Sequence, residues 1–421
     1  MSSSSVLIPS ARSANAPSPP ATSGFAPEVI QRLIDQVAGF NLYVVPDGGS
    51  GSSSQGSTGF VLSETLHRFD VTLQRPDSQG VRATNTFGET VGRVDIRWFM
   101  IPESFVARPD RQPPATRLDT SASQRFVMQE TTFTFGDGRD GFRSFGTGRT
   151  FPMKVGNESR IVVGAIGNLT EGFGKFRGHE GNYTICGDLT PNGFKGNILV
   201  RVQDDNGNLR AGGNIAPIQP QTDPDPQTTY LLWAAQKGKG PDQENSASFG
   251  PDGQLRGLNI PTQLKLLELG FGVKDGFRAA NINVGEVMGR EIGFGRGSVP
   301  GADPSGTALN PFLFEGVAHY SFFDSNKKTV GAITTNVLEG RRFDMRLPAA
   351  PTAPGLRFGF FGPIVTGQGC FEGFEGMFYG STASVFYPPP GDHVITHFYM
   401  ARINDPEGRF RAAFNNELGW S

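Results

Sequence analysis

The sequence predicts an all-β protein built from two tandem eight-stranded antiparallel β-barrels, with a short N-terminal helix. Three observations lead to this prediction: many glycines and phenylalanines, short alternating apolar runs, and motifs that occur twice. The chain has 57 glycines and 35 phenylalanines among 421 residues. Glycines between aromatic and β-branched runs are typical of β-sheet proteins with many turns. A chain of this length is long enough for two domains, each with its own core.

Composition and charge exclude several classes of protein. The formal net charge is −2, from 38 basic and 40 acidic residues, so the basic surface of a nucleic-acid-binding protein is not expected. No apolar run approaches the roughly 20 residues of a membrane span. Two cysteines, Cys186 and Cys370, are too few for a disulfide framework, and Cys370 is expected to be a small buried side chain. The sequence favours a cytoplasmic protein and leaves open whether it forms a homo-oligomer.

The chain divides into four predicted parts. Residues 1–24 are rich in Ser, Ala and Pro and are expected to be a disordered tail. Residues 25–212 should form the first barrel, preceded by a helix at Glu28–Ala38 whose apolar residues fall on one face. A proline-rich linker is expected at 213–229, followed by the second barrel at 230–421.

The two halves share three motifs in the same order. Their spacing is nearly constant, between 195 and 201 residues, which indicates a tandem duplication. The pairs are GETVGR (Gly88–Arg93) with GEVMGR (Gly285–Arg290), GFGKFRGHEG (Gly172–Gly181) with GQGCFEGFEG (Gly367–Gly376), and DDNGNLRA (Asp204–Ala211) with DPEGRFRA (Asp405–Ala412).

Each copy supplies about eight strand candidates without intervening helices, so a sandwich or a closed barrel is expected. Eight strands close around side chains or one small ligand. In the second copy the candidates include Leu264–Leu269, Phe312–Phe323, Leu356–Phe361, Met377–Phe386 and His393–Met400.

These motifs resemble those of a known superfamily. GFGKFRGHEG and GQGCFEGFEG resemble the G-x-G-x-F-x-x-x-x-G hairpin of allene oxide cyclases and plant dirigent proteins. GETVGR and GEVMGR resemble the G-x-x-V-G-R strand of dirigent proteins, and the Gly-containing segment Phe135–Pro152 resembles the strands between the two motifs. The resemblance covers about two thirds of each half, and it implies two barrels with apolar cavities.

The resemblance also implies a type of activity. Members of this superfamily work without cofactors and steer the cyclisation or coupling of an apolar substrate, by holding it in a reactive pose. The residue before the last glycine of the hairpin shapes the cavity, which implies such a role for Glu180 and Glu375. The two families carry an aromatic residue or an arginine there, so neither family's reaction carries over directly.

Candidate catalytic residues lie mainly in the second copy. Glu315 and His319 share one face of a predicted strand because side chains alternate, and the first copy has Met128 and Thr132 at the matching positions. They are predicted to line the active cavity of the second barrel, with Glu375 as a further catalytic group. The alternative is that this strand face is exposed to water.

Arg290 and Glu268 are two further catalytic candidates. Arg290, like Arg93 in the first copy, is expected either to pair with the nearby glutamate of its motif, Glu286 or Glu89, or to stabilise an anion at the cavity wall. Glu268 follows Leu264 and Leu266 on one predicted strand face, where a carboxylate could act as general acid or base. The alternative for Glu268 is a strand end in water.

Aromatic and histidine side chains are predicted to bind the substrate. His393 and His397 are four residues apart on one strand, which is not the spacing of a metal pair, and no metal is predicted. The predicted substrate-binding residues are Phe314, Tyr320, Phe371, His397, Tyr399 and Glu180.

The sequence thus predicts a cofactor-independent cyclase or isomerase that acts on an apolar secondary-metabolite intermediate inside a barrel. A carrier of a lipophilic small molecule is the alternative from another class, and barrels that serve assembly alone are a third. No nucleotide, metal or other cofactor motif is present in the sequence.

Overall fold

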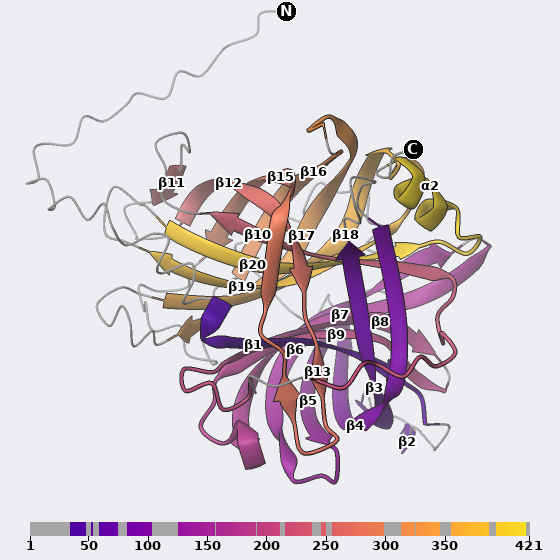
Figure 1. Cartoon of the computed structure of the whole chain (residues 1–421), viewed down its shortest axis with the longest axis vertical. Helices are drawn as coiled ribbons and strands as arrows, with labels where there is room; N and C mark the ends of the chain where they lie inside the picture. Colours follow the sequence, from indigo (N-terminus) through magenta and orange to yellow (C-terminus); the bar gives the residue numbers. More distant parts are fainter. Residues whose placement is uncertain are drawn as a thin grey trace, which may run out of the picture.

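The computed structural model describes residues 34–47, 52–53, 59–74, 82–102, 125–155, 157–190, 192–210, 215–237, 246–249, 255–298, 313–324, 326–345, 355–386 and 393–417. Within these ranges the chain is almost entirely β-strand and forms two large antiparallel sheets, one from each half (Figure 1). The predicted tail, residues 1–24, lies outside the described residues.

The first sheet closes on itself through pairing of its first and third strands, so that eight strands form a ring and the short β2 lies at its margin. Each neighbouring pair is antiparallel, as short hairpin connections require. Its strands are β1 (Val37–Val45), β2 (Ser52–Ser53), β3 (Gly59–Gln74), β4 (Arg82–Pro102), β5 (Arg125–Phe135), β6 (Asp140–Val155), β7 (Glu158–Phe173), β8 (Gly181–Thr190) and β9 (Gly193–Gln203).

The second sheet repeats this order and closes through β10 and β12, with β11 at the margin. Two closed eight-stranded antiparallel sheets were predicted, and this part of the prediction is confirmed. The strands are β10 (Thr228–Lys237), β11 (Ser246–Phe249), β12 (Leu255–Glu268), β15 (Asn283–Ser298), β16 (Leu313–Phe323), β17 (Thr329–Met345), β18 (Gly355–Gly369), β19 (Gly376–Phe386) and β20 (His393–Asn404).

Repeated motifs occupy equivalent places with the same backbone geometry. Gly174, in the one-turn 3-10 helix η2 (Gly174–Phe176), has φ +59°, and its counterpart Gly369 has φ +61°. Gly178 and Gly373 both have φ +78°. Side chains other than glycine rarely adopt these angles, so the turn itself explains why both copies keep the glycines.

The third repeated motif places a buried aspartate after the last strand of each ring. Asp204 accepts hydrogen bonds from the backbone N–H groups of Leu209 and Arg210, at 3.2 and 3.0 Å. Asp405 does the same for Phe410 and Arg411, at 2.8 and 2.9 Å. Among the described residues, the second copy continues from here into a helix, α2 (Arg409–Glu417), and the first does not.

The helix predictions were wrong in two respects. Residues 34–35 are helical, but Val37 and Ala38 belong to β1, where they pair with β9 and help to close the first ring; residues 28–33 lie outside the described residues. Helix α2 was not predicted, although Phe410 and Phe414 have the four-residue spacing of a buried helix face. In the linker region, residues 215–227 form no strand, and β10 begins at Thr228.

The two halves exchange hairpins. A β-bulge near His67 marks where the β3–β4 hairpin leaves its own ring, and its far part places Leu73 and Ala83 in the core of the second barrel. A bulge at the matching place, near Lys265, precedes the segment with β13 (Phe271–Gly272) and β14 (Arg278–Ala279). Figure 1 shows the indigo β3–β4 hairpin rising toward α2 and the segment with β13 descending over the first barrel.

The descending segment closes one end of the first barrel. The ring of Phe277 lies 4.6 Å from that of Phe176, 4.9 Å from Phe40 and 5.0 Å from Phe135, all measured between centroids. The backbone of Phe277 also receives a hydrogen bond from Nζ of Lys175, at 3.0 Å. The first barrel therefore has a core that the second half completes.

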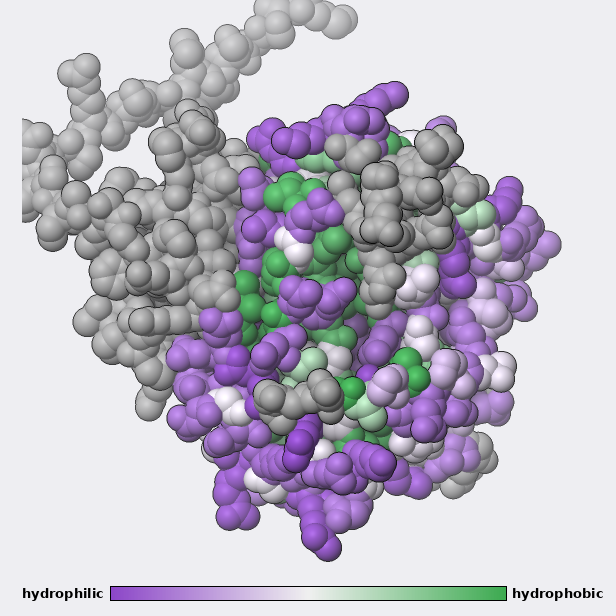
Figure 2. Space-filling model, viewed as in Figure 1, coloured by the Kyte–Doolittle hydropathy of each residue, from purple (hydrophilic) through white to green (hydrophobic). Residues whose placement is uncertain are grey.

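A third apolar cluster joins the outer faces of the two rings. It contains side chains from both halves, including Tyr43, Ile166, Leu232, Phe361 and Phe398. On the face seen in Figure 2, apolar residues gather near the middle of the molecule, and hydrophilic residues cover most of the lower part.

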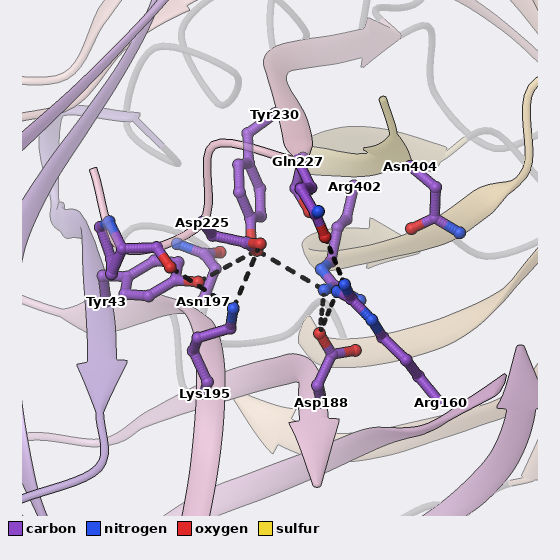
Figure 3. A network of polar contacts seen from close by, with 12 residues as sticks. Tyr43, Arg160, Asp188, Lys195, Asn197, Asp225, Gln227, Tyr230, Arg402 and Asn404 are labelled. Atoms are coloured by element: carbon purple, nitrogen blue, oxygen red, sulfur yellow. Dashed lines mark hydrogen bonds and ion pairs between the residues drawn. The ribbon is translucent and has the colours of Figure 1, made fainter. Parts of the chain in front are cut away.

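The interface between the barrels also holds a buried ionic network (Figure 3). Arg402, on β20, is 1% exposed and pairs with Asp188 of β8 at 2.7 Å and with Asp225 of the linker at 3.5 Å. Arg160 pairs with Asp188 at 3.3 Å, and Lys195 pairs with Asp225 at 3.4 Å. The members of this network come from both barrels and from the linker, so it holds these parts together. Removing one member would leave an uncompensated buried charge.

Two tyrosine hydroxyls complete the coordination of Asp225. Tyr43 and Tyr230 donate to it at 3.1 and 3.2 Å. Burial alone would raise the pKa of Asp225, but the nearby positive charges of Arg402 and Lys195 and these donors hold that pKa below its ordinary value.

The first copy has a buried arginine at the position equivalent to Arg402. Arg201 is 1% exposed, donates to the carbonyl oxygen of Thr396 at 2.8 Å and lies 4.4 Å from the centroid of the Phe398 ring. Burial, and then the positive charge of Arg357, lower the pKa of Arg201 to about 9. Each copy thus sends one arginine across the interface, and Arg402 meets two carboxylates there.

We expect Phe277→Ala to destabilise the first barrel, although Phe277 belongs to the second half. Loss of a fully buried phenylalanine costs about 3–5 kcal/mol. Hydrogen–deuterium exchange should show the loss of protection in β1 and β5, which carry Phe40 and Phe135.

The matched control is Phe410→Ala, because Phe410 packs on Phe371 in the second barrel, with centroids 5.1 Å apart. Its effect should centre on the second barrel. Equal loss of protection in both barrels with Phe277→Ala would contradict the exchange of closing segments.

Candidate functional site

The interior of the second barrel contains a buried carboxyl group. Glu291 lies on β15, one residue beyond the repeated GEVMGR motif, and is 5% exposed. It pairs in register with Thr262 on β12 and with Tyr320 on β16. Charged side chains are seldom buried without partners, so the groups around Glu291 define the site.

Three hydroxyl groups from three different strands contact this carboxyl. Tyr399, on β20, donates to Oε1 of Glu291 at 2.8 Å. Thr262 donates to Oε2, and the hydroxyl of Tyr320 is the third hydrogen-bond partner. The carboxyl group is thus held between hydroxyls supplied by strands that are distant in sequence.

Aromatic rings surround the hydroxyls. The rings of Phe378 and Tyr320 lie 4.7 Å apart, and those of Phe378 and Tyr399 lie 4.9 Å apart. Trp233 lies 5.8 Å from both tyrosines, and Phe360 lies 5.4 Å from Tyr399. The walls around the carboxyl are therefore mainly apolar.

This environment changes the acidity of the carboxyl group. Burial raises the pKa of Glu291 to about 7, against the opposing effect of its three hydroxyl donors. Near neutral pH, protonated and ionised forms of Glu291 are therefore both populated. Burial, and then the charge of Glu291, raise the pKa of Tyr320 and Tyr399 well above their ordinary value, so both remain hydrogen-bond donors.

His397 extends the polar group along β20. Its ring stacks on that of Tyr399, with centroids 4.8 Å apart and an interplanar angle of 18°. Its Nδ1 atom shares a short hydrogen bond with the hydroxyl of Thr382 on β19.

The first barrel has apolar residues at the two main positions of this site. Register shows the equivalence, since Glu291 pairs with Thr262 as Val94 pairs with Glu64. By the repeat spacing, Ile198 takes the place of Tyr399. The carboxyl–tyrosine pair is therefore confined to the second barrel.

The first barrel has glycines at the positions of Thr382 and His397. Gly187 and Gly196 face each other in the first barrel as Thr382 and His397 do in the second. A Cβ atom on Gly187 would lie 2.5 Å from the ring of Phe194, and one on Gly196 would lie 2.8 Å from it. In the first barrel, a phenylalanine ring thus fills this part of the interior.

The polar groups inside the first barrel bond to one another or to the backbone. The hydroxyl of Tyr183 contacts Gln129 at 2.7 Å, Ser144 at 3.0 Å and Thr131 at 3.1 Å. Its buried carboxyl group, Glu64, accepts from the backbone N–H groups of Asp47 and Phe194, at 3.0 and 3.1 Å. Glu64 therefore fixes the backbone around the end of the barrel, whereas the hydrogen bonds of Glu291 within the described part of the chain come from side chains.

Three of the predicted substrate-binding residues come together in the site. Tyr320, His397 and Tyr399 lie side by side in the second barrel. Phe371 is also buried, but it packs near α2, between Phe322 and Phe410.

Four of the five predicted catalytic residues lie outside this cluster. Glu375 and Arg290 are exposed. His319 is half-buried and hydrogen-bonds to Thr334, on the strand face opposite to that of Tyr320. Glu268 is exposed and accepts a hydrogen bond from Asn283 at 2.8 Å.

The remaining site predictions have varied outcomes. Glu180 is 53% exposed and pairs with Arg357 at 3.3 Å, at the interface of the barrels. Phe314 and Glu315 belong to β16, but their side chains lie outside the described residues. Cys370 is buried, as predicted, and so is Cys186.

The expected ion pair between Arg93 and Glu89 does not form. Arg93 pairs with Asp47 at 3.1 Å, and Glu89 pairs with Arg68 at 3.4 Å. The cause is distance, since residues four apart on one strand lie about 13 Å apart.

Glu291 was not predicted, because the repeated motif ends at Arg290, one residue before it. A signal existed in the comparison of the two copies. At the position after the motif, the first copy has valine and the second has glutamate. An acidic residue at a strand position where the other copy has an apolar one indicates a polar site inside that barrel alone.

Comparisons with protein-family models, curated proteins and solved structures found no match to this chain. Among the described residues, no helix has the length and apolar character to cross a membrane. Within the same residues, no group of three or more His, Cys, Asp or Glu side chains is arranged to hold a metal ion.

The raised pKa of Glu291 predicts a specific pH dependence of stability. Its folded-state pKa is about 7 and its ordinary value is 4.5, so the folded protein binds the extra proton between these values. Stability should therefore fall as pH rises from about 4.5 to 7, by up to roughly 3 kcal/mol from this group.

Glu291→Gln should remove this contribution, which chemical denaturation at pH 5 and pH 8 can measure. We expect the variant to lose less stability than the wild type between these two values. Glu372→Gln, which alters an exposed carboxylate of the same barrel, is the control and should behave as the wild type. Parallel pH profiles for wild type and Glu291→Gln would contradict the assignment.

Proposed function

We propose that the second barrel is the site of cofactor-independent acid–base catalysis on a small apolar molecule, as in an isomerase or cyclase. The observation that carries the proposal is the buried carboxyl group of Glu291, with its pKa of about 7, held by tyrosine hydroxyls among aromatic rings. A general acid or base works best when its pKa lies near the working pH.

Each residue of the site has a role in this proposal. The carboxylate form of Glu291 takes a proton from the substrate, and the protonated form returns it at another atom. Tyr320 and Tyr399 hold the carboxyl group in place and donate hydrogen bonds to negative charge that develops nearby. The rings of Trp233 and Phe378 orient an apolar substrate, so that the reacting atoms lie close together.

The resemblance to allene oxide cyclases and dirigent proteins supports the same proposal. Both repeated hairpin motifs lie between corresponding strands of closed eight-stranded rings, as the resemblance implies. We accordingly propose cyclisation or isomerisation of a secondary-metabolite intermediate as the reaction. The first barrel, with Val94 in place of Glu291, then serves as the structural partner.

A carrier for a lipophilic molecule is the second candidate. The aromatic side chains of the second barrel favour it as well, since they would bind an apolar ligand without any proton transfer. The two candidates differ in whether turnover depends on Glu291.

Elimination of 5-nitrobenzisoxazole tests the proposal without knowledge of the natural substrate. A base removes the carbon-bound proton of this apolar probe, the N–O bond breaks, and a coloured cyanophenolate forms. The rate should rise with pH and reach half its maximum near pH 7, as Glu291 ionises. Glu291→Gln should lower the rate at least tenfold, since a general base contributes about 10²–10⁴.

Two further variants sharpen this experiment. Glu372→Gln, an exposed carboxylate, should leave the rate unchanged. Glu375→Gln tests the assignment made from the sequence motif, and a loss as large as that with Glu291→Gln would move the site to the hairpin turn. Binding of the neutral probe N-phenyl-1-naphthylamine without elimination that depends on Glu291 would favour the carrier.

A further inference from the structure

The indole of Trp233 lies at the centre of the aromatic group in the second barrel. Trp233 is on β10 and is fully buried. Its ring lies 5.4 Å from Phe322, 5.8 Å from Tyr320 and from Tyr399, and 5.9 Å from Phe378. It is therefore a direct neighbour of both tyrosines that contact Glu291.

Among the residues that the structure describes, the N–H group of this indole has no hydrogen-bond partner. A buried donor without an acceptor costs about 1–3 kcal/mol, and such groups are rare in native proteins. Water could serve as acceptor, but a buried water needs two to four polar partners, and the rings around Trp233 supply few.

The first barrel shows that this fold can satisfy a buried indole. Trp98 is also fully buried, and its Nε1 atom donates to Oε1 of Gln129 at 2.9 Å. Gln129 in turn donates to Tyr183 at 2.7 Å. Of these two buried indoles, the one without an acceptor is that of Trp233, which lies in the same barrel as the Glu291 carboxyl group.

We infer that the N–H group of Trp233 recognises a carbonyl oxygen, so that the ligand of the second barrel is an apolar molecule bearing a ketone or aldehyde group. The inference rests on the proposed function of the Glu291 site. It adds the chemical class of the substrate and a residue that contacts its reacting oxygen.

A carbonyl group gives the two polar elements of the site complementary tasks. The carboxylate of Glu291 takes a proton from the carbon beside the carbonyl, and the C–H electron pair forms a carbon–carbon double bond. The carbonyl π pair moves to oxygen, where the N–H of Trp233 stabilises the negative charge of the enolate. Neutral Glu291 then returns the proton to another carbon, so the net change is an isomerisation that needs no oxidant or reductant.

Two probes of similar shape separate carbonyl recognition from apolar binding. 2-Acetylnaphthalene carries a carbonyl group, and 2-ethylnaphthalene does not. We expect the wild-type protein to bind the ketone about three- to tenfold more tightly than the hydrocarbon, as one additional hydrogen bond allows. Isothermal titration calorimetry on the full chain measures both dissociation constants.

Trp233→Phe should abolish this preference, so that ketone and hydrocarbon bind with equal affinity, although the smaller ring weakens the apolar contact with both probes. Trp98→Phe is the matched control, because the Trp98 indole is already bonded to Gln129, and the ketone preference should persist in this variant. In ¹H–¹⁵N spectra of the wild type, the Trp233 indole signal should move downfield with the ketone and remain in place with the hydrocarbon. This spectrum keeps the test valid if Trp233→Phe does not fold.

Equal affinity for the two probes, or a preference that survives Trp233→Phe, would overturn the inference, and so would an indole signal that the ketone does not move. Tight binding of the hydrocarbon with no ketone preference would overturn carbonyl recognition alone and leave the apolar site in place. The elimination assay tests the proposed function separately: a rate that does not depend on Glu291 would contradict that function. Binding of neither probe would overturn both.

Discussion

Closure of the barrel ends is the constraint on which the rest of this structure depends. An eight-stranded ring leaves side chains exposed at its ends unless another segment covers them. Here each half provides such a segment to the other, with Phe277 packing on the first barrel and Leu73 entering the core of the second. The ionic network around Arg402 joins the two barrels at the interface between their outer faces. Each half consequently depends on a segment of the other, and a change in a closing segment acts on the core that it covers.

Duplication followed by divergence explains what the halves share and where they differ. Features fixed by backbone geometry are retained in both, such as the left-handed glycines Gly174 and Gly369. Interior positions are less constrained, because a closed ring tolerates different side chains of suitable volume. Divergence therefore appears inside the barrels, where Val94 in one corresponds to Glu291 in the other.

The sequence was sufficient to predict the two closed sheets, because repeated motifs and alternating apolar runs are local signals. Tyr320, His397 and Tyr399 were also found, since aromatic residues on alternating strand positions point to a shared interior. Glu268 was misplaced because β-bulges near Lys265 shift the alternation that the prediction assumed. The exchange of hairpins and the partners of Glu291 could not be predicted, as they depend on contacts between segments distant in the sequence.

The energetic cost of the second barrel's interior is itself an argument for function. A carboxyl group with a pKa of about 7 and an indole donor without a partner both reduce stability. At the position of Glu291 the first barrel has Val94, and its buried indole, that of Trp98, is bonded to Gln129. Because both costly groups lie among the same aromatic rings, a ligand that meets both would offset both. Strain of this kind is characteristic of sites that bind or react, and structural interiors seldom retain it.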